Sequence, residues 1–259
     1  MRRIIIAATT IVALAAAAVA YAQTTSNTYT ASFKFNQSGS GTAKKPVPVG
    51  FTETLTAANA VSGMRAAPLT DIQVSLTGLK ANPKPFPTCS AAKILAAKSD
   101  TVCPKGALVA TGGVTAALGD NTLTGPGTPC QPILDVWNAG GGKLNFFFVI
   151  SGTHQCGGLQ TGSTAPYPGT LVQHGNTLVQ NTPLPPDVST DAGNIGAYGS
   201  LTLETLKWLK LTTKVKGQTV PFLESTGCSG GSHSISVSFT ATDAANENLT
   251  GSASASGKC

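Results

Sequence analysis

Residues 233–241, HSISVSFTA, decide the fold class of this chain. Apolar side chains occupy every second position from Ile235 to Ala241, with serines or a threonine between them. A period of two residues is the spacing of a β-strand that has one face in a core and the other in water. A helix would need apolar residues three and four apart. The stretch therefore predicts a half-buried strand of an antiparallel sheet.

Segments upstream of this strand carry related patterns. Residues 28–35 (TYTASFKF) and 71–79 (DIQVSLTGL) alternate in the same way, and residues 144–150 (LNFFFVI) are apolar on both faces, as in a strand between two layers. The chain also contains 29 glycines and 16 prolines, many of them in the turns between these runs. This organisation predicts a mainly β, antiparallel β-sandwich, either one large sandwich or two fused ones with a sub-boundary near residues 124–132.

The first 22 residues have the features of a secretory signal peptide. Arg2 and Arg3 precede an apolar run, and Ala20-Tyr21-Ala22 forms a small-residue cleavage site. We expect cleavage after Ala22 and a secreted β-sandwich domain over residues 23–259. No second apolar segment has the length of a membrane span, so no span is expected after cleavage and the predicted location is extracellular.

All six cysteines follow this leader, and an even number in an oxidising compartment is typical of disulfides. Proximity in the sequence nominates three bridges: Cys89 with Cys103, Cys130 with Cys156, and Cys228 with Cys259. The residues between the first two cysteines have Ala, Ile and Leu at helical spacing, which predicts one short helix there.

A metal site is the other use for these sulfur atoms. His154 and Cys156, together with His174 and His233, supply suitable ligand atoms. The chain lacks C-x-x-C and H-x-x-x-H spacings, however, so neither a metal nor a cofactor is expected.

A serine hydrolase is one enzymatic hypothesis. Residues 227–231, GCSGG, fit G-x-S-x-G with Ser229 as nucleophile, and His154 with Asp187 or Asp191 would complete a triad. The motif belongs on a turn between a strand and a helix, whereas a strand pattern follows it here. Its second residue is also a cysteine that is expected in a bridge. We therefore predict no catalytic residue and keep the hydrolase as a weaker alternative.

Carbohydrate binding is a second alternative. A glycosidase would require two carboxylates across a cleft, and the acids of this chain form no paired motif. Sugar-binding modules instead expose aromatic rings. Trp137 and Trp208 lie in strand-like segments and are expected in the core, whereas Tyr167 and Tyr198 are placed in loops and are the candidate ligand contacts.

Net charge and composition limit the partners. The formal charge of +6 is spread over a chain with only 11% charged residues, too few for a nucleic-acid surface. The sequence favours a secreted or cell-envelope-associated structural or binding protein without catalytic activity. Envelope polysaccharide or another secreted protein is the expected partner.

Two cysteine-containing motifs carry a resemblance. Residues 86–89 (FPTC), 103–106 (CPKG) and the closing segment 228–259 resemble a family of uncharacterised secreted β-rich proteins of actinobacterial type, which has a P-x-C…C-P module and a C-terminal cysteine pair. Ala107 stands where that pattern has serine, and Ala110 where it has glycine. The resemblance implies a secreted β-rich fold and no catalytic residues.

Overall fold

The computed structural model describes residues 20–21, 27–159, 161–243 and 247–259. Most of the predicted signal peptide, including its cleavage point after Ala22, lies outside these residues. The exception is strand β1, whose residues Ala20 and Tyr21 pair with Ser254 and Ala253 of β18.

The described residues are mainly β, as predicted, with one α-helix and short 3-10 helices. The elements are β1 (Ala20–Tyr21), β2 (Asn27–Gln37), β3 (Val47–Asn59), β4 (Leu69–Thr77), β5 (Leu79–Ala81), α1 (Ala91–Ala97), η1 (Asp100–Val102), η2 (Lys105–Ala107), β6 (Leu108–Gly119), β7 (Thr128–Cys130), β8 (Ile133–Gly140), β9 (Lys143–Ile150), β10 (Gly162–Ser163), β11 (Tyr167–His174), β12 (Thr177–Pro183), η3 (Pro186–Val188), β13 (Tyr198–Trp208), β14 (Thr212–Val215), β15 (Gln218–Pro221), β16 (Leu223–Ser225), β17 (Ser232–Thr242) and β18 (Asn248–Lys258).

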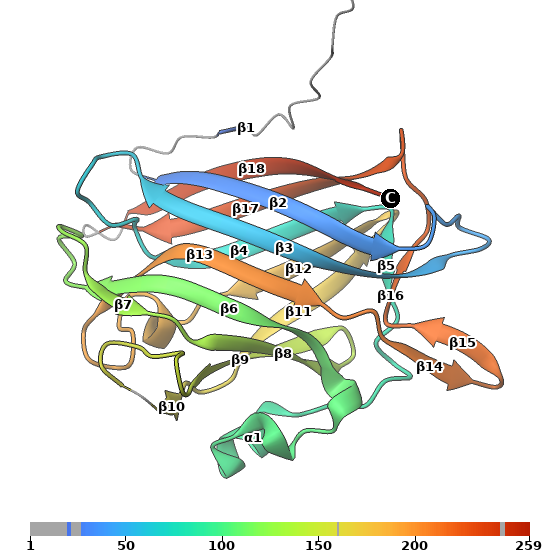
Figure 1. Ribbon diagram of the computed structural model, residues 1–259, viewed down its shortest axis with the longest axis horizontal. Helices are drawn as coiled ribbons and strands as arrows, with labels where there is room; N and C mark the ends of the chain where they lie inside the picture. Colours follow the sequence, from blue (N-terminus) through green and yellow to red (C-terminus); the bar gives the residue numbers. More distant parts are fainter. Residues whose placement is uncertain (1–19, 22–26, 160, 244–246) are drawn as a thin grey trace, which may run out of the picture.

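Every strand pair is antiparallel, and nearly all strands belong to one large sheet. Its order is β1-β18-β17-β4-β12-β11-β9-β8-β6-β13-β3-β16-β5, with β2 joined to β3. Figure 1 shows the sheet folded over itself like a sandwich, with β2, β3, β17 and β18 above β6, β8, β9 and β11. The strands on either side of residues 124–132 belong to this same sheet, since β6 pairs with both β8 and β13.

Alternation in β17 has the consequence predicted for it. Ile235, Val237, Phe239 and Ala241 are each at most 2% exposed, and their polar neighbours point outward. Tyr29 of β2 stacks on Phe239, with ring centroids 4.3 Å apart, so strands from the two ends of the described chain share one core.

The three nominated disulfides are all present: Cys89–Cys103, Cys130–Cys156 and Cys228–Cys259. Helix α1 lies inside the first of these loops, where Ser90 caps its start and buried Ile94 anchors it. The disulfides indicate an oxidising, non-cytoplasmic setting. Within the described ranges, no helix has both the length and the hydropathy needed to cross a membrane.

Candidate functional site

The two candidate tyrosines begin strands and do not lie in loops, so the predicted loop placement is wrong. Pro166 and Pro168 flank Tyr167 and suggested a loop, yet Pro168 is paired opposite Asn145 in β9. Tyr167 is 3% exposed, and its ring stacks on Phe146 with the centroids 5.4 Å apart. Tyr198 is half-buried against the main core. Neither ring offers the broad exposed face on which a sugar could stack.

The residues of the hydrolase hypothesis have separate surroundings. Ser229 forms a bridge with Ser232 in the turn before β17, and its neighbour Cys228 is disulfide-bonded. The His154 ring lies 3.2 Å from the carbonyl oxygen of Gln131, in the loop that the Cys130–Cys156 bridge closes.

Asp187 belongs to η3, and Asp191 accepts a hydrogen bond from the amide of Gly196. In the described part of the chain, no hydrogen bond or ion pair joins His154, Ser229, Asp187 and Asp191 to one another.

The structure reveals an internal cavity between the two layers instead. It has a volume of about 60 Å³ and lies next to the connection between β12 and β13, which contributes Leu184 and Val188 to its wall. Leu69, Val114 and Phe146 make much of the remaining surface apolar. One water molecule needs roughly 10–15 Å³ of such volume, so the cavity has room for several waters or a small organic group.

Two unpaired hydrogen-bond acceptors line this cavity. The Gln180 amide nitrogen donates to Thr182 Oγ1 at 3.1 Å, which leaves the buried Oε1 atom of Gln180 without a donor. No described residue donates a hydrogen bond to the carboxyl group of Glu204, and burial raises the pKa of Glu204 to about 7. A buried acceptor without a donor is uncommon in native proteins and is a place where a ligand can supply the missing bond.

Tyr167 also lines the cavity and responds to the same charge. Burial raises the pKa of its hydroxyl group well above the usual value, and the negative charges of Glu204 and Asp187 raise the pKa further. The phenol therefore stays protonated and can donate a hydrogen bond. The cavity thus combines apolar walls with two acceptors and one donor.

A second carboxyl group lies behind Glu204. Glu53 of β3 pairs opposite Leu206, while Glu204 pairs opposite Leu55, so the two acids are diagonal neighbours on the inward face. Glu53 is 0% exposed and neither of its oxygens has a hydrogen-bond partner. Burial, followed by the charge of Glu204, raises the pKa of Glu53 well above its usual value, which keeps this group neutral at neutral pH. The Trp208 indole lowers the pKa slightly, although its Nε1 atom lacks a partner by hydrogen-bond geometry.

A separate pair of acids lies on the other face of β8. Asp135 of β8 accepts a hydrogen bond from the Thr111 hydroxyl, and Trp137 Nε1 donates to Asp100 Oδ2 at 3.3 Å. Burial is the main cause that raises the pKa of Asp135 to about 6, and the neighbouring Asp100 adds to the increase. These acids have donors, unlike Glu53 and Glu204.

No protein-family model matches the chain, and the search of curated proteins also gave no match. The cavity acids therefore rest on geometry alone. The sequence does contain a signal for them, because Glu53 stands in phase with Phe51 and Leu55, and Glu204 with Leu206. An acid on the apolar face of a strand pattern marks a buried ionisable group.

Proposed function

We propose that this protein is a secreted binding protein that takes a small amphipathic molecule in the cavity beside residues 184–199, without catalysing a reaction. The unpaired Oε1 atom of Gln180 carries the proposal, because a buried acceptor in an apolar cavity recognises a ligand that brings a donor. The leader pattern and the disulfides support an extracellular role.

The chemistry of the lining defines the ligand class. Gln180 Oε1 and the Glu204 carboxyl group both accept hydrogen bonds, and Leu69 and Phe146 contribute apolar surface. A ligand with a short apolar part and an amino or hydroxyl group complements these groups. An anion does not, since ionised Glu204 would repel it. A polysaccharide is less well matched, because the Tyr167 ring is already stacked inside the core.

Binding of small probes tests this proposal. We expect n-butylamine and butan-1-ol to bind in ligand-observed NMR, and butyrate, of similar size but anionic, to bind far more weakly. Amine affinity should rise from pH 6 to pH 8, because Glu204, with a pKa of about 7, loses its proton over this interval while the amine stays charged. Alcohol affinity should change much less.

Gln180→Met removes the acceptor at nearly constant volume. We expect it to weaken probe binding by roughly 3- to 10-fold, the value of one hydrogen bond. Gln173→Met, on the exposed face of β11, is the matched control and should leave binding unchanged. Equal binding of amine and butyrate, or a Gln180→Met variant that binds as the wild type does, would show that this cavity is not the binding site.

A further inference from the structure

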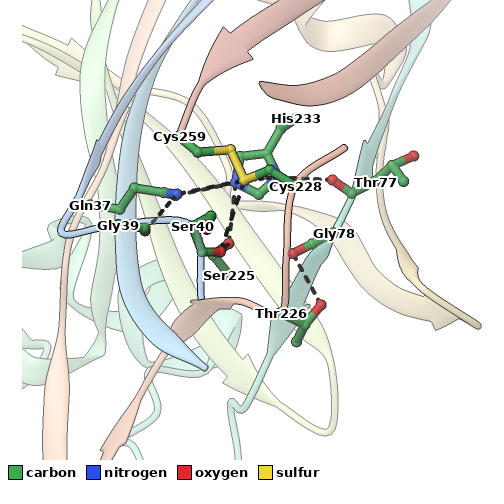
Figure 2. The surroundings of a disulfide bond; sticks show 10 residues. All are labelled: Gln37, Gly39, Ser40, Thr77, Gly78, Ser225, Thr226, Cys228, His233 and Cys259. Carbon is green, nitrogen blue, oxygen red and sulfur yellow. Dashed lines mark hydrogen bonds between the residues drawn. A yellow bond between two sulfur atoms is a disulfide. The ribbon is translucent and has the colours of Figure 1, made fainter. Parts of the chain in front are cut away.

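The start of β17 holds a cluster of sulfur, nitrogen and oxygen atoms that lies outside the cavity. Figure 2 shows the Cys228–Cys259 disulfide next to the ring of His233, with Gln37 and Ser225 on its other sides. His233 is 1% exposed. Among the described residues, Cys228, His233 and Cys259 are the one group of three or more such side chains whose ligand atoms all lie within 4.8 Å.

The hydrogen bonds of His233 leave one ring nitrogen without a donor. Its Nδ1 atom lies 3.0 Å from the carbonyl oxygen of Thr77, which can only accept, so Nδ1 carries a proton. Nε2 lies 3.2 Å from Oε1 of Gln37. The amide of Gln37 is oriented by the bond from its nitrogen to the Gly39 carbonyl, so the oxygen faces the ring.

Every other neighbour of Nε2 is also an acceptor. The Ser225 hydroxyl, 3.3 Å away, donates to the Ser40 carbonyl at 2.6 Å and has no second proton to give. Sγ of Cys228, at 3.5 Å, is in a disulfide. A positive centre is needed between Nε2 and these acceptors. In the disulfide form it is a proton on the ring, which burial disfavours because it lowers the pKa of His233.

We propose that reduction of the Cys228–Cys259 disulfide creates a tetrahedral zinc site formed by both cysteine thiolates, His233 Nε2 and Gln37 Oε1. Zinc bonds are about 2.3 Å to sulfur and about 2.0–2.1 Å to nitrogen or oxygen, which places neighbouring ligands roughly 3.3–3.8 Å apart. The separations from Nε2, 3.5 Å to Sγ of Cys228 and 3.2 Å to Oε1 of Gln37, are close to these values.

The backbone holds the ligands in place when the sulfur–sulfur bond is absent. The amide of Cys259 donates to the carbonyl of Gly231 at 3.1 Å, and β17 and β18 pair from Ser232↔Lys258 onward. The bond from His233 Nδ1 to Thr77 fixes the ring orientation and leaves Nε2 free for the metal, as in many zinc sites. Rotation of the two cysteine side chains is then sufficient to separate the sulfurs.

The chemistry balances with a dithiol as reductant. The dithiol supplies two electrons and two protons, the bond between Cys228 and Cys259 breaks, and the reductant becomes a disulfide. Zn²⁺ then displaces one proton from each cysteine thiol, and the neutral imidazole binds without releasing a proton. Both cysteines are half-exposed, so a small reductant can reach the bond.

Co²⁺ binding to the full-length protein tests this site. Tris(carboxyethyl)phosphine is the reductant, since a dithiol would compete for the metal. We expect the reduced protein to bind one Co²⁺ with thiolate-to-cobalt charge transfer and the intense visible bands of a tetrahedral ion, and Zn²⁺ to displace it. The oxidised protein should show neither band.

Two double variants control for the other sulfurs. Cys228→Ser/Cys259→Ser should lose the bands, while Cys130→Ser/Cys156→Ser, which removes another partly exposed bridge, should keep them. Thermal melting of each oxidised variant checks that it has folded. Bands in the first variant, bands in the oxidised wild type, or no bands in the reduced wild type would each overturn the proposal.

Substitutions of Gln37 separate a ligand from a structural neighbour. Gln37→Ala should weaken Zn²⁺ binding by about 10-fold or more, whereas Gln37→Glu should strengthen it because a carboxylate is a better zinc ligand. A merely structural role for Gln37 would make both changes harmful. Equal zinc affinity in the wild type and both variants would contradict the assignment of Gln37 as the fourth ligand.

Discussion

Glu53 and Glu204 lie on the inward face of the sheet, whereas Asp100 and Asp135 lie on the outer face of β8, beneath the loop closed by Cys89–Cys103. The inner acids receive no hydrogen bond from a described side chain apart from the weak interaction of Glu53 with the Trp208 indole. The outer acids receive them from Thr111 and Trp137. Burial raises pKa values in both pairs.

The difference between the pairs separates stability from function. A buried acid with donors stabilises its surroundings, because removing it leaves the donors unpaired. A buried acid without donors destabilises the fold and is retained only where it serves a purpose. This contrast is why we place the ligand at Glu204 and treat Asp100 and Asp135 as structural.

The largest expected effect is the pH dependence that Glu204 gives to stability. Its pKa is about 7 in the folded protein, against a model value of 4.5, so the unfolded chain releases its proton first as the pH rises. The free energy of unfolding should therefore be highest below pH 4.5 for this group and fall by up to about 3 kcal/mol as the pH rises through 7.

Urea unfolding at several pH values measures this slope. Glu204→Gln should remove the part of it between pH 6 and 7, while Asp135→Asn should remove the part below about pH 6, because the Asp135 pKa rises only to about 6. Identical curves for the wild type and Glu204→Gln would show that Glu204 titrates normally.

Substitutions with opposite signs come next in size. Glu53→Met replaces an unsatisfied acid by an apolar chain of similar length and should stabilise the protein by about 2 kcal/mol at pH 7. Asp100→Leu should destabilise it by a similar amount, about 1–3 kcal/mol, because the Trp137 Nε1 donor is left buried and unpaired. Denaturation of both variants at one pH gives the comparison, and a loss of stability in Glu53→Met would refute the contrast.

The smallest effect concerns one hydroxyl group. Thr111→Val keeps the shape of the side chain and removes the donor to Asp135, so it should cost about 1 kcal/mol of stability. It should also raise the pKa of Asp135 further, since the hydrogen bond from Thr111 lowers that pKa. NMR titration of the Asp135 carboxyl carbon checks the direction, and a lower pKa in the variant would be evidence against this bond.

Local patterns were sufficient for much of the fold. The alternation of residues 233–241 predicted β17, and sequence proximity predicted all three disulfides. The cavity could not be predicted in this way, because Gln180 and Glu204 meet only through the order of strands in the sheet. Tyr167 was misplaced since its flanking prolines resemble loop residues, although β9 pairs with this segment.

The contact between Tyr29 and Phe239 has a further consequence, for the order of events in folding. Strand β4 is paired with β12 and β17, both far downstream, and the aromatic stack joins β2 to β17. Hairpins such as β8–β9 and β11–β12 can form early because their partners are adjacent. The shared core waits for β17, so closing long loops limits the rate at which the native state is reached.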